Sequence, residues 1–589
     1  MHEARHRAVP GSPFRTILRY NRPYWRQYLV GAGLSAAFVS IGLCMPLVIR
    51  AVVGRFEDNA VTLQALWLYF VGLLGIATAT GVARYFERRL IIGASRKSEY
   101  DLRNDFFRHL QALSRAFFHR TQTGDLMARA TNDLNYVRMF IGPGIMGTID
   151  MMRLPFTLAL MLYLSKGLTL LALLPLPFVS LLVYAIVMFM HRQSQKVQAQ
   201  YAVLTACVQE NLAGARVVKA YGIADRQIEA FENESRHYMR ENVKLASVMA
   251  LAWPMVGLVV SLMILLVIWR GGFMVIEGRL RLDDFTGFIV CMLLLIWPLA
   301  EFGWILTLYQ RGAVGMNRIN QILAEAPTVR DHEQTQAHVT ISSGGLRLDH
   351  VDFAYGDASV LHDVDFEVQP GQTVALVGMT GSGKSSIASL LVREYDPTAG
   401  RVLIDGMDVR HIPLSTLRGA IGFVPQDTFL FSDTIRANLT FGRPDATQED
   451  LEYASEVAQF TETVASLPNG YDTLLGERGV NLSGGQKQRL AIARAVICDP
   501  TILILDDALS SVDTHTEEHI LRRLKEVMAT RTGVIVSHRI STIQHADLIL
   551  VLEDGRIVER GTHAALTGQG GLYAALYERQ LLEEELEEA

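Results

Sequence analysis

Long apolar runs alternate with long polar segments over the first 310 residues of the chain. Six of these runs are long enough to cross a hydrocarbon core of roughly 30 Å as helices. They lie at 28–49, 66–83, 139–164, 168–190, 248–269 and 285–309. We therefore predict an all-α transmembrane domain with six spans.

Arginine and lysine gather before the first run and in the segments 84–138 and 191–244. Segments of this kind remain in the cytoplasm, and an even number of spans then returns the chain to that side. We expect a multi-pass protein of the plasma membrane whose second half lies in the cytoplasm. Both inner segments are polar and helical in composition, so spans two to five are predicted to continue as helices beyond the bilayer.

The helical pattern is interrupted once in each of the two long cytoplasmic segments. Residues 117–126 and 214–222 contain glycine and break the pattern before it resumes. Each interruption would lie at the far tip of a helical pair, where a short element could contact another domain. An ordinary turn at each tip is the alternative.

A few ionisable residues fall inside the predicted spans, where charge is costly and usually faces a partner or a cavity. Asp150 and Arg153 are three residues apart, which would put them on one helix face and allow them to neutralise each other. Glu301 follows Trp297 and Pro298 and is the candidate for contact with a substrate. Pro298 is expected to kink the sixth span.

Composition places the excess of apolar residues in the first half and an ordinary α/β composition in the second. Hydrophobic residues make up 50% of the chain, mean hydropathy is +0.21, and the formal charge of −5 gives no reason to expect nucleic acid. Four distant cysteines indicate neither a metal site nor a disulfide framework. The N-terminus lacks the features of a cleavable signal peptide.

These patterns predict five segments. Residues 1–27 are basic and aromatic, typical of a segment lying on an anionic membrane face or of a disordered arm. The transmembrane domain covers 28–325, and a polar linker covers 326–345. Alternating strands and helices over 346–580 predict a three-layer α/β nucleotide-binding domain. An acidic tail, 581–589, completes the chain.

The clearest chemical signal is the segment 378–385, which fits the phosphate-loop pattern between a short apolar strand and the start of a helix. Backbone N–H groups of such a loop surround phosphate oxygens. Lys384 would reach the β- and γ-phosphates, and Ser385 would offer its hydroxyl to Mg²⁺. The predicted nucleotide-binding residues of this segment are Gly378, Thr380, Gly381, Ser382, Gly383, Lys384, Ser385 and Ser386.

Two further strands end in residues suited to nucleotide hydrolysis. Asp506 ends the apolar run 502–506, the arrangement that holds Mg²⁺ in phosphate-loop proteins. Asp507 follows at the position of a hydrolytic carboxylate. His538 ends the run 534–538 and could contact the γ-phosphate.

A second helix start, at Ser483, Gly484 and Gly485, would also present backbone N–H groups to a phosphate. One nucleotide does not need two such sites within one domain. The economical explanation is that the second site serves the ATP of another chain.

The segment 482–486 resembles the signature motif of ATP-binding cassette (ABC) proteins, which makes Ser483, Gly484, Gly485 and Gln486 candidate contacts to ATP. Tyr355 matches the aromatic residue that stacks on adenine, and Gln426 matches the Q-loop glutamine, a candidate catalytic residue and Mg²⁺ ligand. Residues 476–479 and 510–513 match the exporter X-loop and the D-loop, and His538 matches the switch histidine. Six spans ahead of one such cassette resemble a half-transporter of the type IV exporter fold, and the wording is similar to that of bacterial multidrug-resistance-like halves of the MdlA and TmrA type.

The resemblance implies two halves that hold two ATP molecules between them, each between one half's phosphate loop and the other's signature. The two cytoplasmic tips would be coupling helices. ATP binding and hydrolysis, with Asp507, His538 and Gln426 as the catalytic set, would drive alternating access of a cavity in the lipid bilayer. The substrates implied are hydrophobic or amphipathic, such as drugs, lipids or peptides.

The chain departs from the family at Asp507, where most cassettes have glutamate. The shorter side chain retracts the carboxylate by roughly 1 Å, and a displacement of that size can cost about 10²-fold in rate. In heterodimeric exporters of this family the half with this aspartate contributes the degenerate site, so the resemblance implies that this chain is such a half and that its partner carries the glutamate. A slow homodimer or an importer with the exporter fold is the alternative. The six spans disfavour a soluble cassette ATPase, and vectorial transport would exclude an ATP-gated channel.

Overall fold

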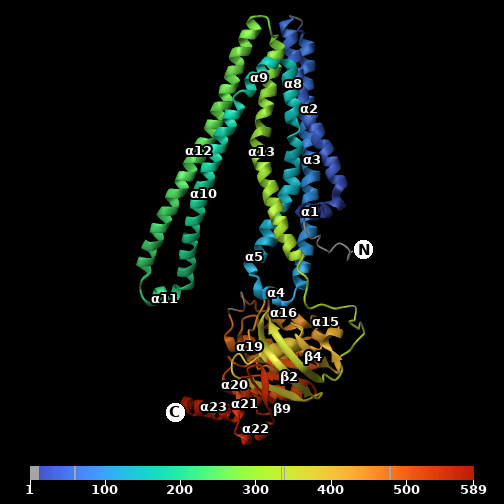
Figure 1. The fold of residues 1–589 in the computed structure, drawn as a ribbon, viewed down its shortest axis with the longest axis vertical. Helices are drawn as coiled ribbons and strands as arrows, with labels where there is room; N and C mark the ends of the chain where they lie inside the picture. Colours follow the sequence, from blue (N-terminus) through green and yellow to red (C-terminus); the bar gives the residue numbers. More distant parts are fainter. Residues whose placement is uncertain are drawn as a thin grey trace. The chain divides into compact units, whose positions relative to one another are not determined.

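A computed structural model describes residues 12–58, 61–332, 334–336, 338–476, 479 and 481–588. The chain divides into two compact units (Figure 1). The first unit comprises Met1–Phe107 and Leu126–Ala324, and the second comprises Arg108–Asp125 and Glu325–Ala589. The first cytoplasmic tip therefore belongs to the same unit as the cassette.

The first unit is helical throughout its described residues. Its principal helices are α1 (Pro13–Asn21), α2 (Trp25–Glu57), α3 (Leu63–Ala112), α6 (Leu134–Met139), α7 (Ile145–Asp150), α8 (Arg153–Leu164), α9 (Lys166–Leu173), α10 (Leu176–Ala213), α11 (Ala215–Ala220), α12 (Ala224–Ile276) and α13 (Leu282–Leu323).

Five helical stretches in the described part of the chain are long and apolar enough to cross a membrane. They are Pro13–Glu57, Leu63–Ala112, Thr123–Leu164, Gly257–Ile276 and Leu282–Leu323, and they correspond to predicted spans one, two, three, five and six. The predicted fourth span, 168–190, falls on α9 and α10, where several side chains lie outside the described residues.

The long helices extend far beyond the roughly 20 residues that a bilayer requires. α3 has 50 residues, α10 has 38 and α12 has 53. α10 and α12 pack side by side and are joined by the short helix α11, as Figure 1 shows in green. These lengths confirm that the polar inner segments continue the spans as helices.

The charges of the third span involve one more partner than the sequence predicts. α7 ends at Asp150 and α8 begins at Arg153, and the two methionines between them keep helical dihedral angles. Asp150 pairs with Arg84 of α3, with 2.8 Å between carboxylate and guanidinium. The Arg153 guanidinium lies 5.0 Å from the ring centre of Phe38. Asp150 also interacts electrostatically with Arg153, as the sequence predicts, although its direct ion pair is with Arg84.

α13 runs through Pro298 without ending. Glu301 lies on this helix, partly buried, and interacts electrostatically with Arg153. Contact between Glu301 and a substrate stays a prediction.

The second unit contains α4 (Arg115–Arg120), the start of α5 (Thr123–Ala128), two sheets and the cassette helices. The four-stranded antiparallel sheet has the order β2 (Ala358–Val368), β1 (Leu346–Tyr355), β4 (Ala399–Ile404) and β5 (Met407–Asp408). The six-stranded sheet has the order β10 (Arg556–Gly561), β9 (Leu548–Glu553), β3 (Thr373–Gly378), β8 (Thr532–Val536), β7 (Ile502–Asp506) and β6 (Ile421–Val424). All neighbours in the six-stranded sheet are parallel except β10 and β9.

The cassette helices are α14 (Lys384–Leu391), α15 (Leu414–Gly419), α16 (Ile435–Leu439), α17 (Gln448–Val457), α18 (Thr461–Ser466), α19 (Gly484–Val496), α20 (Thr514–Met528), α21 (Ile540–Ile543), α22 (His563–Gln569) and α23 (Leu572–Glu588).

Two apolar cores lie on opposite faces of the six-stranded sheet. Along β3, Val374 and Leu376 join the core shared with the antiparallel sheet and α14, while Ala375 and Val377 join the core shared with α16, α17, α19 and α20. This alternation follows from the two-residue period of a strand. The predicted α/β cassette is confirmed.

Strands β3, β7 and β8 are parallel neighbours, so their carboxyl ends meet at one edge of the sheet. The phosphate loop follows β3, Asp506 ends β7, and His538 follows β8. Ligands of open parallel sheets bind at this kind of edge. The topology alone therefore gathers the predicted hydrolytic residues.

Candidate nucleotide-binding site

The phosphate loop requires glycine for two separate reasons. Gly381 and Gly383 have φ values of +89° and +98°, a left-handed conformation that side chains disfavour. At Gly378 the reason is space, because a Cβ there would lie 2.1 Å from the carbonyl oxygen of Leu552. Thr380 lies exposed at the tip of the loop, and Ser382 is buried beneath it.

Lys384 begins α14 and turns its ammonium group back over the loop. Its Nζ donates hydrogen bonds to the carbonyl oxygens of Gly378 and Met379, both at 2.8 Å. Burial lowers the pKa of Lys384, and the negative charges of Asp507 and Asp506 partly oppose that effect. The loop thus holds a desolvated cation where phosphate oxygens are expected.

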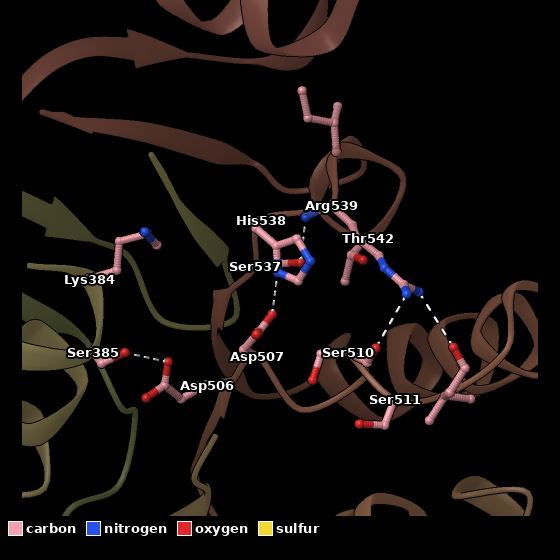
Figure 2. A network of polar contacts seen from close by, with 12 residues as sticks. Lys384, Ser385, Asp506, Asp507, Ser510, Ser511, Ser537, His538, Arg539 and Thr542 are labelled. Carbon is pink, nitrogen blue, oxygen red and sulfur yellow. Dashed lines mark hydrogen bonds and ion pairs between the residues drawn. The ribbon is translucent and has the colours of Figure 1, made fainter. Parts of the chain in front are cut away.

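Ser385 and Asp506 meet beside this cation. The Ser385 hydroxyl donates a hydrogen bond to Asp506 Oδ1 at 2.9 Å, as Figure 2 shows. Burial raises the pKa of Asp506, and the hydrogen bond from Ser385 partly offsets the rise. Both residues line a cavity of about 1130 Å³ together with Gln426. A hydroxyl, a carboxylate and an amide oxygen form a donor set suited to Mg²⁺, which prefers oxygen ligands.

Tyr355 lines the same cavity at the end of β1. Its ring centre lies 4.7 Å from that of Phe353 and 5.2 Å from that of Tyr395, both in edge contacts. The Tyr355 hydroxyl is 3.2 Å from Ser386 Oγ. These contacts fix the ring at the cavity wall, in keeping with the predicted stacking on a base.

Asp507 and His538 form a pair at the neighbouring strand ends. Asp507 adopts a left-handed conformation with φ of +50°, and its N–H donates to the carbonyl oxygen of Val536 at 2.8 Å. Its Oδ1 lies 2.8 Å from His538 Nδ1 (Figure 2). The Asp507 side chain is 15% exposed and that of His538 is 57% exposed. The two predicted catalytic groups are therefore in contact.

The signature residues lie apart from this cavity. Ser483 caps α19 by accepting a hydrogen bond from the Gln486 N–H, and Gln486 Oε1 accepts one from the Ser483 N–H. None of Ser483, Gly484, Gly485 and Gln486 lines the cavity. The sequence predicts this separation, since it assigns the signature to another chain's nucleotide.

The first cytoplasmic tip contributes to the cavity in a way the sequence does not predict. Arg115, His119 and Arg120 of α4 line it, and Arg115 forms an ion pair with Glu394, next to Tyr395. The only sequence signal was the interrupted helix pattern at 117–126. In the matched X-loop, Glu477 and Arg478 lie outside the described residues.

Other residues join the site through polar contacts that no motif indicated. Gln488 and Arg539 bond to the D-loop, and Glu517 pairs with Arg539. Gln580 bonds to the backbone on both sides of Arg539. The position of Arg539 directly after a strand-end histidine was the one available signal.

Apolar helices of membrane-spanning length, fused to a phosphate-loop cassette, define a membrane protein that uses a nucleoside triphosphate. Residues 29–299 match the family model described as the ABC transporter transmembrane region, and residues 361–510 match the model described as ABC transporter. The chain belongs to the ABC transporter family.

Relatives match the chain over nearly its whole length. The multidrug resistance-like ATP-binding protein MdlA of Escherichia coli is 35% identical over 98% of this chain and 98% of its own. The ATP-dependent lipid A-core flippase of Nitrosococcus oceani is 35% identical over 96% of this chain and 95% of its own. A bacterial Atm1-family ABC exporter solved with ATP bound has a TM-score of 0.75 at 29% identity and covers 94% of this chain and 98% of its own.

These findings confirm the exporter-type fold, the fusion of a helical membrane domain to an α/β cassette, and the resemblance to multidrug-like exporters. They also support ATP-coupled transport by a multi-pass membrane protein, consistent with the plasma membrane.

Proposed function

We propose that this chain is the slow-site half of a heterodimeric exporter that moves hydrophobic or amphipathic substrates out of the cytoplasm. The observation that carries the proposal is the pair of Asp507 and His538, in which an aspartate occupies the hydrolytic position. The exporter-type fold supports outward transport over the alternative of an importer.

The substrate class follows from the relatives. Their names refer to multidrug resistance in Escherichia coli MdlA and to lipid A-core flipping in Nitrosococcus oceani. Both kinds of cargo combine apolar and polar parts. We therefore assign the substrate to this class.

In the proposed nucleotide site, Tyr355 stacks on adenine and the phosphate loop holds the phosphates through its N–H groups and Lys384. Ser385, Gln426 and Asp506 would hold Mg²⁺, which when bound neutralises charge that develops on the phosphates. Asp507 would accept a hydrogen bond from the attacking water, and His538 would contact the γ-phosphate. Asp507 also holds the imidazole in place at 2.8 Å.

The expected slow hydrolysis at this site rests on how far the carboxylate of residue 507 extends toward the attacking water. An aspartate carboxylate is one methylene shorter than glutamate, or roughly 1 Å, and misplacement of that order can cost about 10²-fold. In addition, Asp507 Oδ1 already contacts His538 Nδ1, which leaves only the other carboxylate oxygen for the attacking water. Both effects support a slow site on this chain.

The signature supports the second half of the proposal. It contains all the expected residues and lies away from the chain's own nucleotide cavity. It would therefore complete a site on a partner with the usual glutamate. A homodimer with two slow sites is the second candidate, favoured by the consensus residues His538 and Gln426.

The test is the ATPase activity of the purified chain, alone and together with a candidate partner half-transporter that carries the glutamate. We expect the chain alone to hydrolyse ATP very slowly and the pair to hydrolyse it readily. In the pair, Asp507→Ala should leave most of the activity, whereas the equivalent change at the partner's glutamate should remove it. Fast turnover by the chain alone that is abolished by Asp507→Ala would refute the heterodimer.

A further inference from the structure

Arg539 connects the switch loop to the D-loop. Its side chain donates hydrogen bonds to the carbonyl oxygens of Ser510, at 3.3 Å, and Val512, at 3.4 Å. The same guanidinium forms an ion pair with Glu517 of α20, whose side chain is 4% exposed. Thr542 of α21 donates to the second oxygen of Glu517 at 2.6 Å. A carboxylate as buried as that of Glu517 needs partners for both of its oxygens, and Arg539 and Thr542 supply them.

The D-loop is joined in turn to the signature helix. Gln488 of α19 is 5% exposed, donates to Ser510 Oγ at 2.9 Å and accepts from the Ser511 N–H at 2.9 Å. Gly485 sits so close to this loop that a Cβ would lie 2.8 Å from the Ser511 carbonyl oxygen. α19 and the D-loop therefore cannot move far apart without breaking these contacts.

The switch loop is also held from the C-terminal helix. Gln580 of α23 donates to the carbonyl oxygen of His538 and accepts from the Ile540 N–H at 2.8 Å. The Arg539 N–H donates to Ser537 Oγ at 3.0 Å. The backbone that carries His538 is thus fixed on both sides of Arg539, and the Arg539 side chain is aimed at the D-loop.

We propose that Arg539 is a positioning residue that couples the switch loop of this chain's own nucleotide site to its signature helix. The inference rests on the proposed function, in which that signature completes the partner's site. Movement of His538 toward a nucleotide pulls on Arg539, then on the carbonyls of Ser510 and Val512, and through Gln488 on α19. In this way, nucleotide binding at the slow site of this chain can change the position of the signature helix, which completes the faster site of the partner.

The test uses the full-length transporter in the assembly that hydrolyses ATP. That assembly is either the chain with its partner half-transporter or the chain alone. Arg539→Gln should lower kcat about tenfold while the KM for ATP stays within about twofold, because Arg539 acts on positioning and not on nucleotide binding. Arg539→Lys should retain the thermal stability, since an ammonium can still pair with Glu517. It should keep the loss of kcat, since it cannot span Glu517 and both carbonyls as the planar guanidinium does.

Arg531→Gln provides the matched control. The Arg531 side chain is 18% exposed and forms an ion pair with Asp499 at 2.6 Å. This ion pair involves neither the switch loop nor the D-loop. The substitution should lower the thermal midpoint without lowering kcat per folded transporter. The double variant Gln488→Ala with Arg539→Gln should lower kcat by less than the product of the two single reductions. Both substitutions interrupt the same series of contacts between the switch loop and α19, so their effects are not independent.

Wild-type kcat in Arg539→Lys, or a loss in Arg539→Gln that only follows the loss of folded protein, would overturn the coupling role. The assembly in which ATPase activity appears tests the heterodimer separately, so the failure of one proposal is distinguishable from the failure of the other.

Discussion

Two helix starts in this cassette carry glycine and serine, yet they are built differently. α14 begins after Gly383, a left-handed residue whose position has no side-chain cap, and it lines the large cavity through Ser385. α19 begins at Ser483 with a complete capping box, and Gly485 packs against the Ser511 carbonyl. The N–H groups of a helix start need acceptors.

The comparison teaches how two helix starts of similar composition can differ in the acceptors available to their N–H groups. At α14 the N-cap residue supplies no side-chain acceptor, so a bound phosphate can take that place. At α19 the Ser483 hydroxyl accepts a hydrogen bond from the Gln486 N–H and so satisfies one of these donors. The first helix start lines a cavity formed by its own chain, whereas the signature residues at the second helix start do not line that cavity.

The largest expected effect comes from removing the cation of the α14 site. Lys384→Ala should weaken binding of a fluorescent ATP analogue to this chain by about 10- to 100-fold, in keeping with roughly 1.5–3 kcal/mol for a charged hydrogen bond. Lys525→Ala on the exposed side of α20 is the matched control and should bind normally. Equal affinity in the two variants would contradict the assignment of the site to α14.

The next effect separates the two signature glycines. A methyl group at Gly485 would lie 2.8 Å from the Ser511 carbonyl, whereas one at Gly484 would meet its nearest atom, Ser511 Cβ, at an ordinary 3.4 Å. Gly485→Ala should therefore destabilise the cassette by about 1–3 kcal/mol, the usual cost of overpacking. Gly484→Ala should be close to neutral in the same thermal unfolding assay. Equal midpoints would show that the D-loop does not press on α19.

Much of this architecture could be predicted from the sequence because each feature depends on local pattern. The apolar runs predicted the helices, and the strand ends placed the phosphate loop, Asp506 and His538 at one edge. Parallel strands bring their carboxyl ends together whatever the intervening chain does.

What the sequence did not predict depends on contacts between distant segments. The direct ion pair of Asp150 is with Arg84, 66 residues away. The Arg115 contact with Glu394 joins residues 279 apart, and the left-handed backbone of Asp507 depends on packing against β8. The roles of the site residues stay predictions, since geometry places them without showing their chemistry.

The smallest expected effect tests whether the Ser483 hydroxyl does more than cap α19. Ser483→Ala should cost about 1 kcal/mol of stability, while Ser483→Gly should cost only a few tenths, because glycine is a good N-cap residue. Both variants remove the hydroxyl. If that hydroxyl contacts the partner's nucleotide, the two variants should lose ATPase activity by similar factors despite their different thermal midpoints. If activity instead follows stability, with Ser483→Gly close to wild type, then Ser483 serves only as a cap and the backbone of α19 alone faces the phosphate.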